Sequence, residues 1–162
     1  MAKSAAKTTR ATQALDKVGL RYSLHAYDYD PDAPRIGLQA AEALGVPPGR
    51  VLKTLMAAVD GRTICLLVAS DREVSMKRVA AAFSGKAAAM LKPADAERLT
   101  GYHVGGISPL GQKRAFPTAI DSGSLGDPGT EIHVNGGGRG LQIRLTEGDL
   151  VAVLQALVVP LT

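Results

Sequence analysis

The sequence predicts one α+β domain, and three observations carry that prediction. The chain has 162 residues, the usual length of a single domain. Segments with helical spacing and segments with strand-like character both occur, without the strict βαβ order of a parallel sheet. Two strand-like segments are separated only by Asp60-Gly61, a pair that suits a tight type I′ hairpin. We therefore expect a compact domain with a largely antiparallel or mixed sheet.

Elements in the first half follow from apolar spacing and from glycine stops. Apolar residues share one face in two segments that each end at a glycine, which predicts helices over residues 10–18 and 38–44. Alternation predicts a strand over residues 21–27. The segments 51–59 and 62–69, on either side of Asp60-Gly61, are the expected strands of the hairpin.

The second half continues with short elements. Ser75 can cap a helix through Phe83, and Thr146 with Asp149 resembles a capping box for a last helix through about Leu157. A further short helix is expected over residues 93–99, closed by Gly101. The remaining strands are expected over residues 86–91, 117–121, 131–135 and 141–145.

The first nine residues differ from the rest of the chain. They include Lys3 and Lys7 and no acidic residue, so we expect residues 1–9 to form a basic flexible tail and residues 10–162 to form the domain. The net charge of +4 favours polyanionic partners without identifying one. No apolar stretch approaches the roughly 20 residues needed to cross a bilayer, so no membrane partner is expected.

The only cysteine, Cys65, lies in an apolar run, where it is expected to be a core residue rather than a nucleophile. A chain that cannot form an internal disulfide fits a reducing compartment, and we expect a cytoplasmic protein. The three histidines, His25, His103 and His133, are far apart and have no nearby cysteine or carboxylate pattern. We therefore expect no metal.

The common catalytic and nucleotide-binding motifs fail. Asp28, Asp30 and Asp32 begin like a calcium loop, but the glycine and the glutamate that such a loop needs are missing. The glycine-rich segments match neither a P-loop nor a dinucleotide-binding fingerprint, and no G-x-S-x-G elbow is present. No cofactor is therefore expected.

Lys53 is the one anomaly of its strand. It is the only charged residue in the segment 51–59, so it either extends its amine from a sheet edge to water or is held in a pocket to meet an anion or an acyl group. Two glycine-rich loops, 105–111 and 136–140, could bring backbone amides close to a phosphate or to a developing oxyanion. Each loop could equally be an ordinary turn.

Together these segments resemble the YbaK/EbsC family, the Cys-tRNA(Pro) deacylases of the bacterial prolyl-tRNA editing superfamily. The resemblance covers nearly the whole chain, and its most specific stretch is 101–113. The other matching stretches are His25-Ala26-Tyr27-Asp28, Lys53-Thr54-Leu55 and Gly136-Gly137-Gly138-Arg139-Gly140-Leu141. It implies a mixed, barrel-like sheet surrounded by helices, a pocket for the aminoacylated 3′ end of tRNA, and prolyl-tRNA synthetase as a partner.

The resemblance also implies the site. Lys53 falls on the family's essential lysine and Tyr27 on its pocket tyrosine, and the loop 105–111 falls on the segment that faces the aminoacyl ester. The expected catalytic residues are Lys53, Gly105 and Gly106. The expected substrate-binding residues are Tyr27, Thr54, Ile107, Ser108, Pro109, Asn135, Gly136 and Arg139.

Two departures from the family pattern affect substrate choice. Asn135 stands where the family usually has serine, and Leu38-Gln39 stands where it often has Asp-Glu. The implied chemistry is substrate-assisted: the cysteine thiol of the substrate attacks its own ester, and the protein positions the ester and stabilises charge. Cys-tRNA(Cys) as a further substrate, Ala-tRNA(Pro) or another aminoacyl-tRNA with water as the nucleophile, and a non-catalytic tRNA- or synthetase-binding module are the alternatives.

Overall fold

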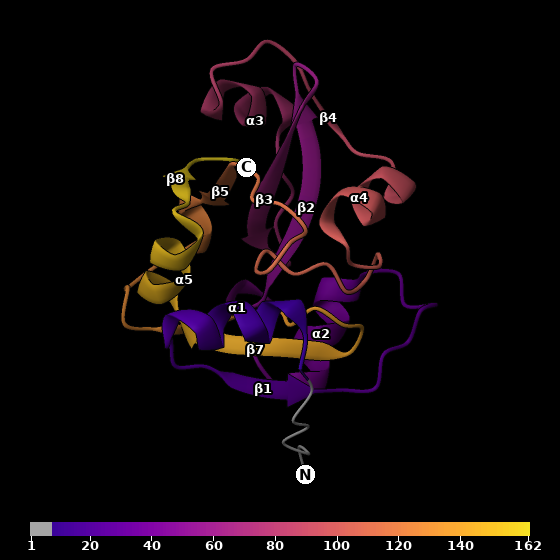
Figure 1. The fold of residues 1–162 in the computed structure, drawn as a ribbon, viewed down its shortest axis with the longest axis vertical. Helices are drawn as coiled ribbons and strands as arrows, with labels where there is room; N and C mark the ends of the chain where they lie inside the picture. The colour runs from indigo at the N-terminus through magenta and orange to yellow at the C-terminus, as the bar shows by residue number, and fades with distance from the viewer. Residues whose placement is uncertain (1–7) are drawn as a thin grey trace.

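The computed structural model describes residues 8–162, so most of the expected tail lies outside the described residues. Figure 1 shows an α+β fold, which confirms the predicted class. Five helices are present among the described residues: α1 (Arg10–Val18), α2 (Ile36–Leu44), α3 (Met76–Ala82), α4 (Pro93–Thr100) and α5 (Glu147–Leu154). The strands are β1 (Ser23–Ala26), β2 (Leu52–Val59), β3 (Arg62–Ala69), β4 (Ala88–Met90), β5 (Thr118–Asp121), β6 (Glu131–Asn135), β7 (Leu141–Thr146) and β8 (Leu157–Val159).

The strands form two sheets. The smaller one is antiparallel with the order β1-β7-β6, and the larger one is mixed with the order β4-β2-β3-β5-β8. A parallel bridge between Val51 and His133 joins the sheets just before β2 begins. The β2–β3 hairpin turns at Asp60-Gly61, where both residues have positive φ, 49° and 82°, as a type I′ turn requires.

The main core lies between the two sheets and is closed by α1 and α5. It contains Leu15 of α1, Leu52 and Met56 of β2, Ile143 of β7 and Leu150 of α5, each at most 3% exposed. A second cluster packs α3 against the other face of the large sheet, and a third packs α2 against Val51. The start of β2 therefore touches both sheets and α2, and residues that follow it are held from several sides.

Local sequence explains most helix ends. Thr9 caps α1 through a reciprocal capping box, and Gly19 ends this helix in the left-handed conformation. Ser75 accepts a hydrogen bond from the Arg78 amide at the start of α3, as its position predicted. The helix expected over 38–44 begins two residues earlier, at Ile36.

The expected last helix is wrong at its C-terminal end. It stops at Leu154, because Gln155 adopts a left-handed conformation with φ 49° and Leu157 begins a strand. This strand, β8, pairs in parallel with β5 through Ala119 and Leu157, so it supplies backbone partners to a buried strand that would otherwise be an open edge. None of the helices over residues 8–162 is long and apolar enough to cross a membrane.

Candidate active site

A cavity of about 250 Å³ collects the main sequence-predicted residues. Segments far apart in the sequence contribute to it: the start of β2, the loop after α4, the end of β6 and the start of β7. Its lining residues are Val51, Leu52, Lys53, Thr54, Leu55, Val104, Gly105, Ile107, Asn135 and Gln142. Lys53, Thr54, Gly105, Ile107 and Asn135 are thus brought together, although the first and last are 82 positions apart.

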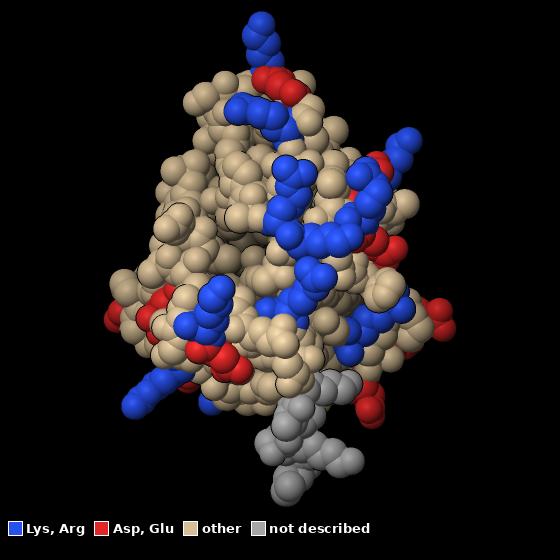
Figure 2. All heavy atoms as spheres, viewed as in Figure 1, with Lys and Arg blue, Asp and Glu red and all other residues tan. Residues whose placement is uncertain are grey.

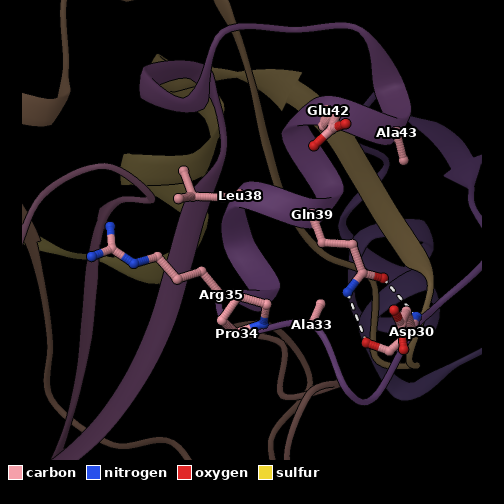
Figure 3. Close-up of a pocket in the computed structure, with 8 residues that line it drawn as sticks. All are labelled: Asp30, Ala33, Pro34, Arg35, Leu38, Gln39, Glu42 and Ala43. Carbon is pink, nitrogen blue, oxygen red and sulfur yellow. Dashed lines mark hydrogen bonds between the residues drawn. The ribbon is translucent and has the colours of Figure 1, made fainter.

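A larger cavity, about 490 Å³, lies along α2 and contains none of these residues. Figure 3 shows it between the loop before α2 and the outer side of that helix. The Gln39 side chain spans the loop there, donating to the Asp30 carbonyl oxygen (2.9 Å) and accepting from the Asp30 amide (2.7 Å). These bonds anchor the loop. The described residues that line the α2 cavity include neither a lysine nor a glycine-rich loop, in contrast to those of the smaller cavity.

Among the residues that the structure describes, Lys53 is the only one with a cationic side chain that lines the smaller cavity. Its side chain is 22% exposed, and its Nζ lies 3.5 Å from the carboxylate of Glu73, which is 81% exposed. An ion pair with so exposed a partner contributes at most about 1 kcal/mol. An anionic ligand in the cavity can therefore replace Glu73 as the partner of the amine at little cost.

Two polar atoms of the cavity have no hydrogen-bond partner among the described residues. These are Oγ1 of Thr54 and Oε1 of Gln142, both shielded from solvent. Leaving a buried polar atom unpaired costs about 1–3 kcal/mol. Because both atoms are closed to solvent, a ligand in the cavity recovers that free energy only if the Thr54 and Gln142 side chains turn toward it.

Gln142 was not among the sequence-predicted residues. Its position follows from strand pairing, because Asn135 of β6 lies opposite Gln142 of β7 across the glycine-rich turn. Leu141 and Ile143, its neighbours, point into the core, so Gln142 faces the other way, toward the cavity. The sequence could have identified Gln142 as the cross-strand partner of Asn135 in the hairpin around the turn 136–140.

Asn135 holds the two glycine-rich loops together. Its Oδ1 accepts from the amides of Gly137 (2.7 Å) and Gly138 (3.2 Å). Its Nδ2 donates to the carbonyl oxygens of Gly105 and Gly138, both at 3.2 Å. All four hydrogen bonds of this side chain are to the two loops, so at the cavity wall it acts as a strut that connects them.

The loops approach so closely that glycine is required. A Cβ on Gly105, which has φ 90°, would stand 2.4 Å from the hydroxyl of Tyr29. A Cβ on Gly106 would stand 2.9 Å from the backbone of Gly138 and Arg139. The amide of Gly106 donates to the His103 carbonyl oxygen (2.8 Å), whereas the amide of Gly105 makes no hydrogen bond within residues 8–162. Of the two, the Gly105 amide is the one available to a ligand.

The other sequence-predicted residues lie around the cavity rather than on it. The Ser108 side chain is buried and accepts from the Leu110 amide (3.2 Å), and Pro109 lines a separate cavity beside Phe116. Gly136 is buried against Leu141. Arg139 donates through Nε to the carbonyl oxygen of Val104 (2.9 Å), so it braces the rim from outside.

Tyr27 stands one layer behind the cavity wall. It packs on Ala40, Ala41 and Val51, and its hydroxyl is buried without a hydrogen-bond partner in the described part of the chain. Burial raises the pKa of its phenol, and the neighbouring Gln142 amide opposes part of that rise, although the two do not form a well-aligned hydrogen bond. Tyr27 thus touches Val51 of the wall, and its nearness to Gln142 links it to the same site.

No thiol of the protein is available to the cavity. Cys65 is fully buried in the core, as the sequence predicted, and burial raises the pKa of its thiol to about 12. Its sulfur therefore stays protonated at neutral pH and has no access to a ligand.

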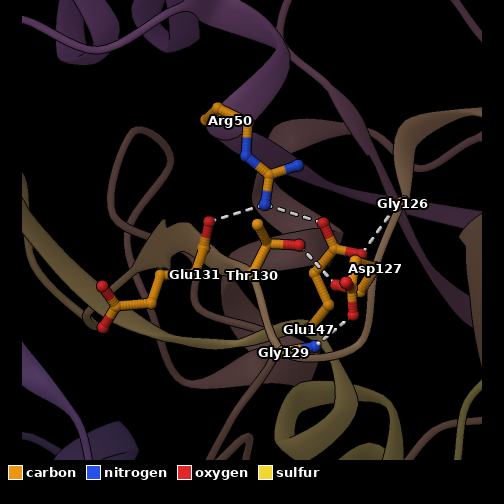
Figure 4. Close-up of polar contacts among 7 residues, drawn as sticks. All are labelled: Arg50, Gly126, Asp127, Gly129, Thr130, Glu131 and Glu147. Carbon is orange, nitrogen blue, oxygen red and sulfur yellow. Dashed lines mark hydrogen bonds and ion pairs between the residues drawn. The ribbon is translucent and has the colours of Figure 1, made fainter.

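A polar network fixes the segment that leads into β2 (Figure 4). The guanidinium of Arg50 reaches the buried carboxylate of Glu147 (2.7 Å) and the carbonyl oxygen of Glu131 (2.5 Å). The same carboxylate accepts from the amide of Gly126 (2.7 Å). Arg50 therefore ties the approach to Lys53 to the beginnings of β6 and α5.

Comparison with known proteins relates the chain to proteins of translation. A family model described as the aminoacyl-tRNA editing domain matches residues 30–152. A protein of Enterococcus faecalis, provisionally named a Cys-tRNA(Pro)/Cys-tRNA(Cys) deacylase, EbsC, is 35% identical over 115 residues, which are 70% of this chain and 68% of that protein. A proline–tRNA ligase of Acidithiobacillus ferrooxidans is 31% identical over 88 residues, 54% of this chain but only 15% of the ligase.

A solved structure shares the fold. It is described, provisionally, as a trans-editing enzyme for prolyl-tRNA synthetase; it superimposes with a TM-score of 0.82 at 25% identity, over 94% of each chain. The structural similarity extends over nearly the whole chain, and the residues matched by the family model, 30–152, include both glycine-rich loops and the strand that carries Lys53.

Proposed function

Because the chain belongs to the aminoacyl-tRNA editing domain family and is therefore an aminoacyl-tRNA deacylase, we propose that it acts in trans on Cys-tRNA(Pro), proline tRNA mischarged with cysteine. The similarity to EbsC supports cysteine as the amino acid and leaves Cys-tRNA(Cys) as a further substrate. The similarity to a prolyl-tRNA synthetase trans-editing structure and to proline–tRNA ligases supports proline tRNA, with the synthetase as a partner. A cytoplasmic location remains a prediction.

The observation that carries this proposal is the meeting of Lys53 and Gly105 at one cavity. In the proposed complex the Lys53 amine binds the terminal adenosine or its phosphate. The free amide of Gly105 donates to the ester oxygen as that oxygen gains negative charge. The Thr54 and Gln142 side chains, whose Oγ1 and Oε1 have no partner within residues 8–162 of the free protein, turn toward the aminoacyl group and hold it in place.

The nucleophile comes from the substrate. Its thiol sulfur bonds to the ester carbonyl carbon, the bond from that carbon to the ribose oxygen breaks, and the thiol proton ends on the ribose hydroxyl. The cyclic thioester released is then opened by water. Within residues 8–162, the only hydroxyl side chain lining the cavity is that of Thr54, and the protein's only thiol is buried. The site therefore supplies positioning and charge stabilisation.

A deacylation panel with purified protein tests the proposal. Proline tRNA is charged with cysteine, alanine or proline, and the first-order loss of each ester is followed. We expect rapid loss of cysteine and survival of proline. If the alanyl ester is lost at the same rate as the cysteinyl ester, the proposal is replaced by the alternative, deacylation of Ala-tRNA(Pro) by an activated water.

A further inference from the structure

The cationic surface beside the cavity is the feature of the molecule that the proposed function leaves unused. Figure 2 shows Lys and Arg side chains gathered across the middle of one face, around the region that Figure 1 assigns to α4, the loop after it and the start of α1. Acidic side chains on this face lie mostly toward its margins. This distribution points to a polyanion that lies over these segments.

Three segments meet at this surface. The loop 101–113 packs on the start of α1, because a Cβ on Gly111 would stand 2.3 Å from the Arg10 carbonyl oxygen. The turn 136–140 joins them, since Thr9 donates to the carbonyl oxygen of Gly136 (2.6 Å). The three segments bring together cations that the sequence separates widely.

The exposed cations of these segments are Arg10, Lys113, Arg114 and Arg139. The Arg10 guanidinium and the Lys113 side chain both lie within 3.6 Å of the point where a Cβ on Gly101 would stand, so they are neighbours. Arg114 stacks on the ring of Phe116 with 5.8 Å to the ring centre, and Arg139 stacks on Tyr29 with 5.6 Å. Stacking restricts where these two guanidinium groups point.

None of the four cations has a carboxylate partner among residues 8–162. The segments 99–120 and 132–146 contain no Asp or Glu at all. By contrast Arg50, Arg72, Arg98 and Arg144, elsewhere on the chain, each lie within 3.5 Å of a carboxylate. Lys77, Arg78 and Lys86 also have no carboxylate partner among residues 8–162, so what distinguishes this surface is that two of the segments forming it contain no acidic residue.

The surface is continuous with the cavity. Arg139 donates to the carbonyl oxygen of Val104, which lines the cavity, and the loop that supplies Gly105 and Ile107 runs on to Lys113 and Arg114. A nucleic acid whose 3′ end enters the cavity must leave it along one of its rims. At this rim it meets Arg139, while the nearby Glu97 carboxylate is already engaged, since it accepts from the Val104 amide (2.8 Å) and lies 3.6 Å from His103.

We propose that Arg10, Lys113 and Arg114, with Arg139 at the rim, form a binding surface for the phosphate backbone of the RNA that carries the aminoacyl group. This proposal rests on the proposed function for the identity of the RNA, and it adds where the body of the tRNA lies. The surface contributes to affinity without reading sequence, because its contacts are to phosphates. We expect the Cys-CCA end alone to make few of these contacts, because it carries few phosphates.

The test separates the surface from the chemistry. The triple variant R10A/K113A/R114A is compared with the wild type in the deacylation of full-length Cys-tRNA(Pro) and of the aminoacylated trinucleotide Cys-CCA. We expect KM for the full tRNA to rise about tenfold, with kcat unchanged and Cys-CCA cleaved as by the wild type. The log–log salt slope of tRNA binding should fall in magnitude by about 1 per cation removed.

Two controls keep the test specific. The variant K77A/R78A/K86A also removes three exposed cations, from α3 and the segment after it, and should keep the wild-type KM and salt slope. The charge-conserving variant R10K/K113R/R114K should restore most of the slope.

The proposal is overturned if the two alanine triples behave alike or if the slope is unchanged. It is also overturned if the effect appears only when prolyl-tRNA synthetase is present, which would assign the surface to a protein partner. If the wild type fails to cleave either substrate, the proposed function fails, while the salt slope with uncharged tRNA still tests the surface.

Discussion

Asn135 is bonded directly to Gly105: its Nδ2 donates to the Gly105 carbonyl oxygen over 3.2 Å. The same amide group holds Gly137 and Gly138 on the other loop. One side chain therefore sets the distance between the two glycine-rich loops. It holds the peptide that follows the free Gly105 amide, whereas the peptide that contains this amide is held by Arg139, which donates to the Val104 carbonyl oxygen.

Replacing Asn135 with alanine should loosen both loops. The change leaves the Gly105 carbonyl and the Gly137 amide without a partner, at a cost of about 1–3 kcal/mol in the free energy of unfolding. Deacylation should fall further than stability suggests, because the loop that carries the Gly105 amide is less firmly held beside the cavity. Asn135→Ser keeps one hydroxyl to bridge the loops and should be intermediate in both denaturant unfolding and kcat. Wild-type kcat in the alanine variant would show that the strut has no bearing on the site.

Gly105 and Gly106 should respond differently to an added methyl group. The contact of Gly105→Ala is with the hydroxyl of Tyr29, so the double variant G105A/Y29F should recover part of the lost stability; the remainder reflects the strain of alanine at φ 90°. Gly106→Ala meets the backbone of Gly138 and Arg139, and no single side-chain change relieves that. Thermal unfolding of G105A, G106A, G105A/Y29F and G106A/Y29F checks this. Equal rescue of both glycine substitutions by Tyr29→Phe would contradict the described packing.

Lys53 should matter for activity and little for stability. Lys53→Ala removes a partly exposed ion pair worth at most about 1 kcal/mol, but it also removes the only cation among the described residues that line the cavity. We expect deacylation to fall by about 100-fold or more, as when a charge-stabilising group is lost. The matched control is Glu73→Gln, which breaks the same ion pair from its exposed end and should stay active. Equal loss of activity in both variants would mean that the ion pair itself, rather than the amine, is required.

Stability should decline between pH 7 and pH 5 because of His133. Burial, reinforced by His25, Arg144 and Arg50, lowers the pKa of His133 from 6.5 to about 4. Since the unfolded chain binds a proton at His133 in this range and the folded chain does not, stability is lost as the pH falls below about 6.5. The loss at pH 5 should be about 2 kcal/mol. Denaturant unfolding at the two pH values measures it, and in His133→Gln most of the difference should disappear. A pH dependence that is the same in the variant would assign the effect to other groups, such as His25, whose pKa burial also lowers.

Much of the fold could be predicted from local signals. The limits of α1, of the β2–β3 hairpin and of β6 follow from caps, from Asp60-Gly61 and from alternation, all of which act over a few residues. Strand β8 could not be found in this way. Leu157, Val158 and Val159 continue the apolar run of α5, and only the distant edge of β5 makes an extended conformation favourable.

The candidate site was predictable in part. That Lys53 and the loop after α4 belong together follows from the family resemblance, because no local rule joins residues 53 and 105. Which polar groups of the site already form hydrogen bonds within the protein could be learned only from the structure. The Gly106 amide donates to the His103 carbonyl oxygen, the Asn135 side chain bonds to both loops, and Arg139 Nε donates to the Val104 carbonyl oxygen. Such bonds depend on how the loops pack against one another rather than on residue type.

The most direct test of the account compares Cys-tRNA(Pro) with Ser-tRNA(Pro) on the wild-type enzyme and on Cys65→Ala. The two substrates differ by one atom, and only the thiol ionises near neutral pH, with a reference pKa of about 8.5. If the substrate thiol is the nucleophile, Cys-tRNA(Pro) is deacylated while Ser-tRNA(Pro) survives, and Cys65→Ala behaves as the wild type because Cys65 is buried. Equal hydrolysis of the two esters would contradict substrate-assisted chemistry and point to an activated water in the Lys53 cavity.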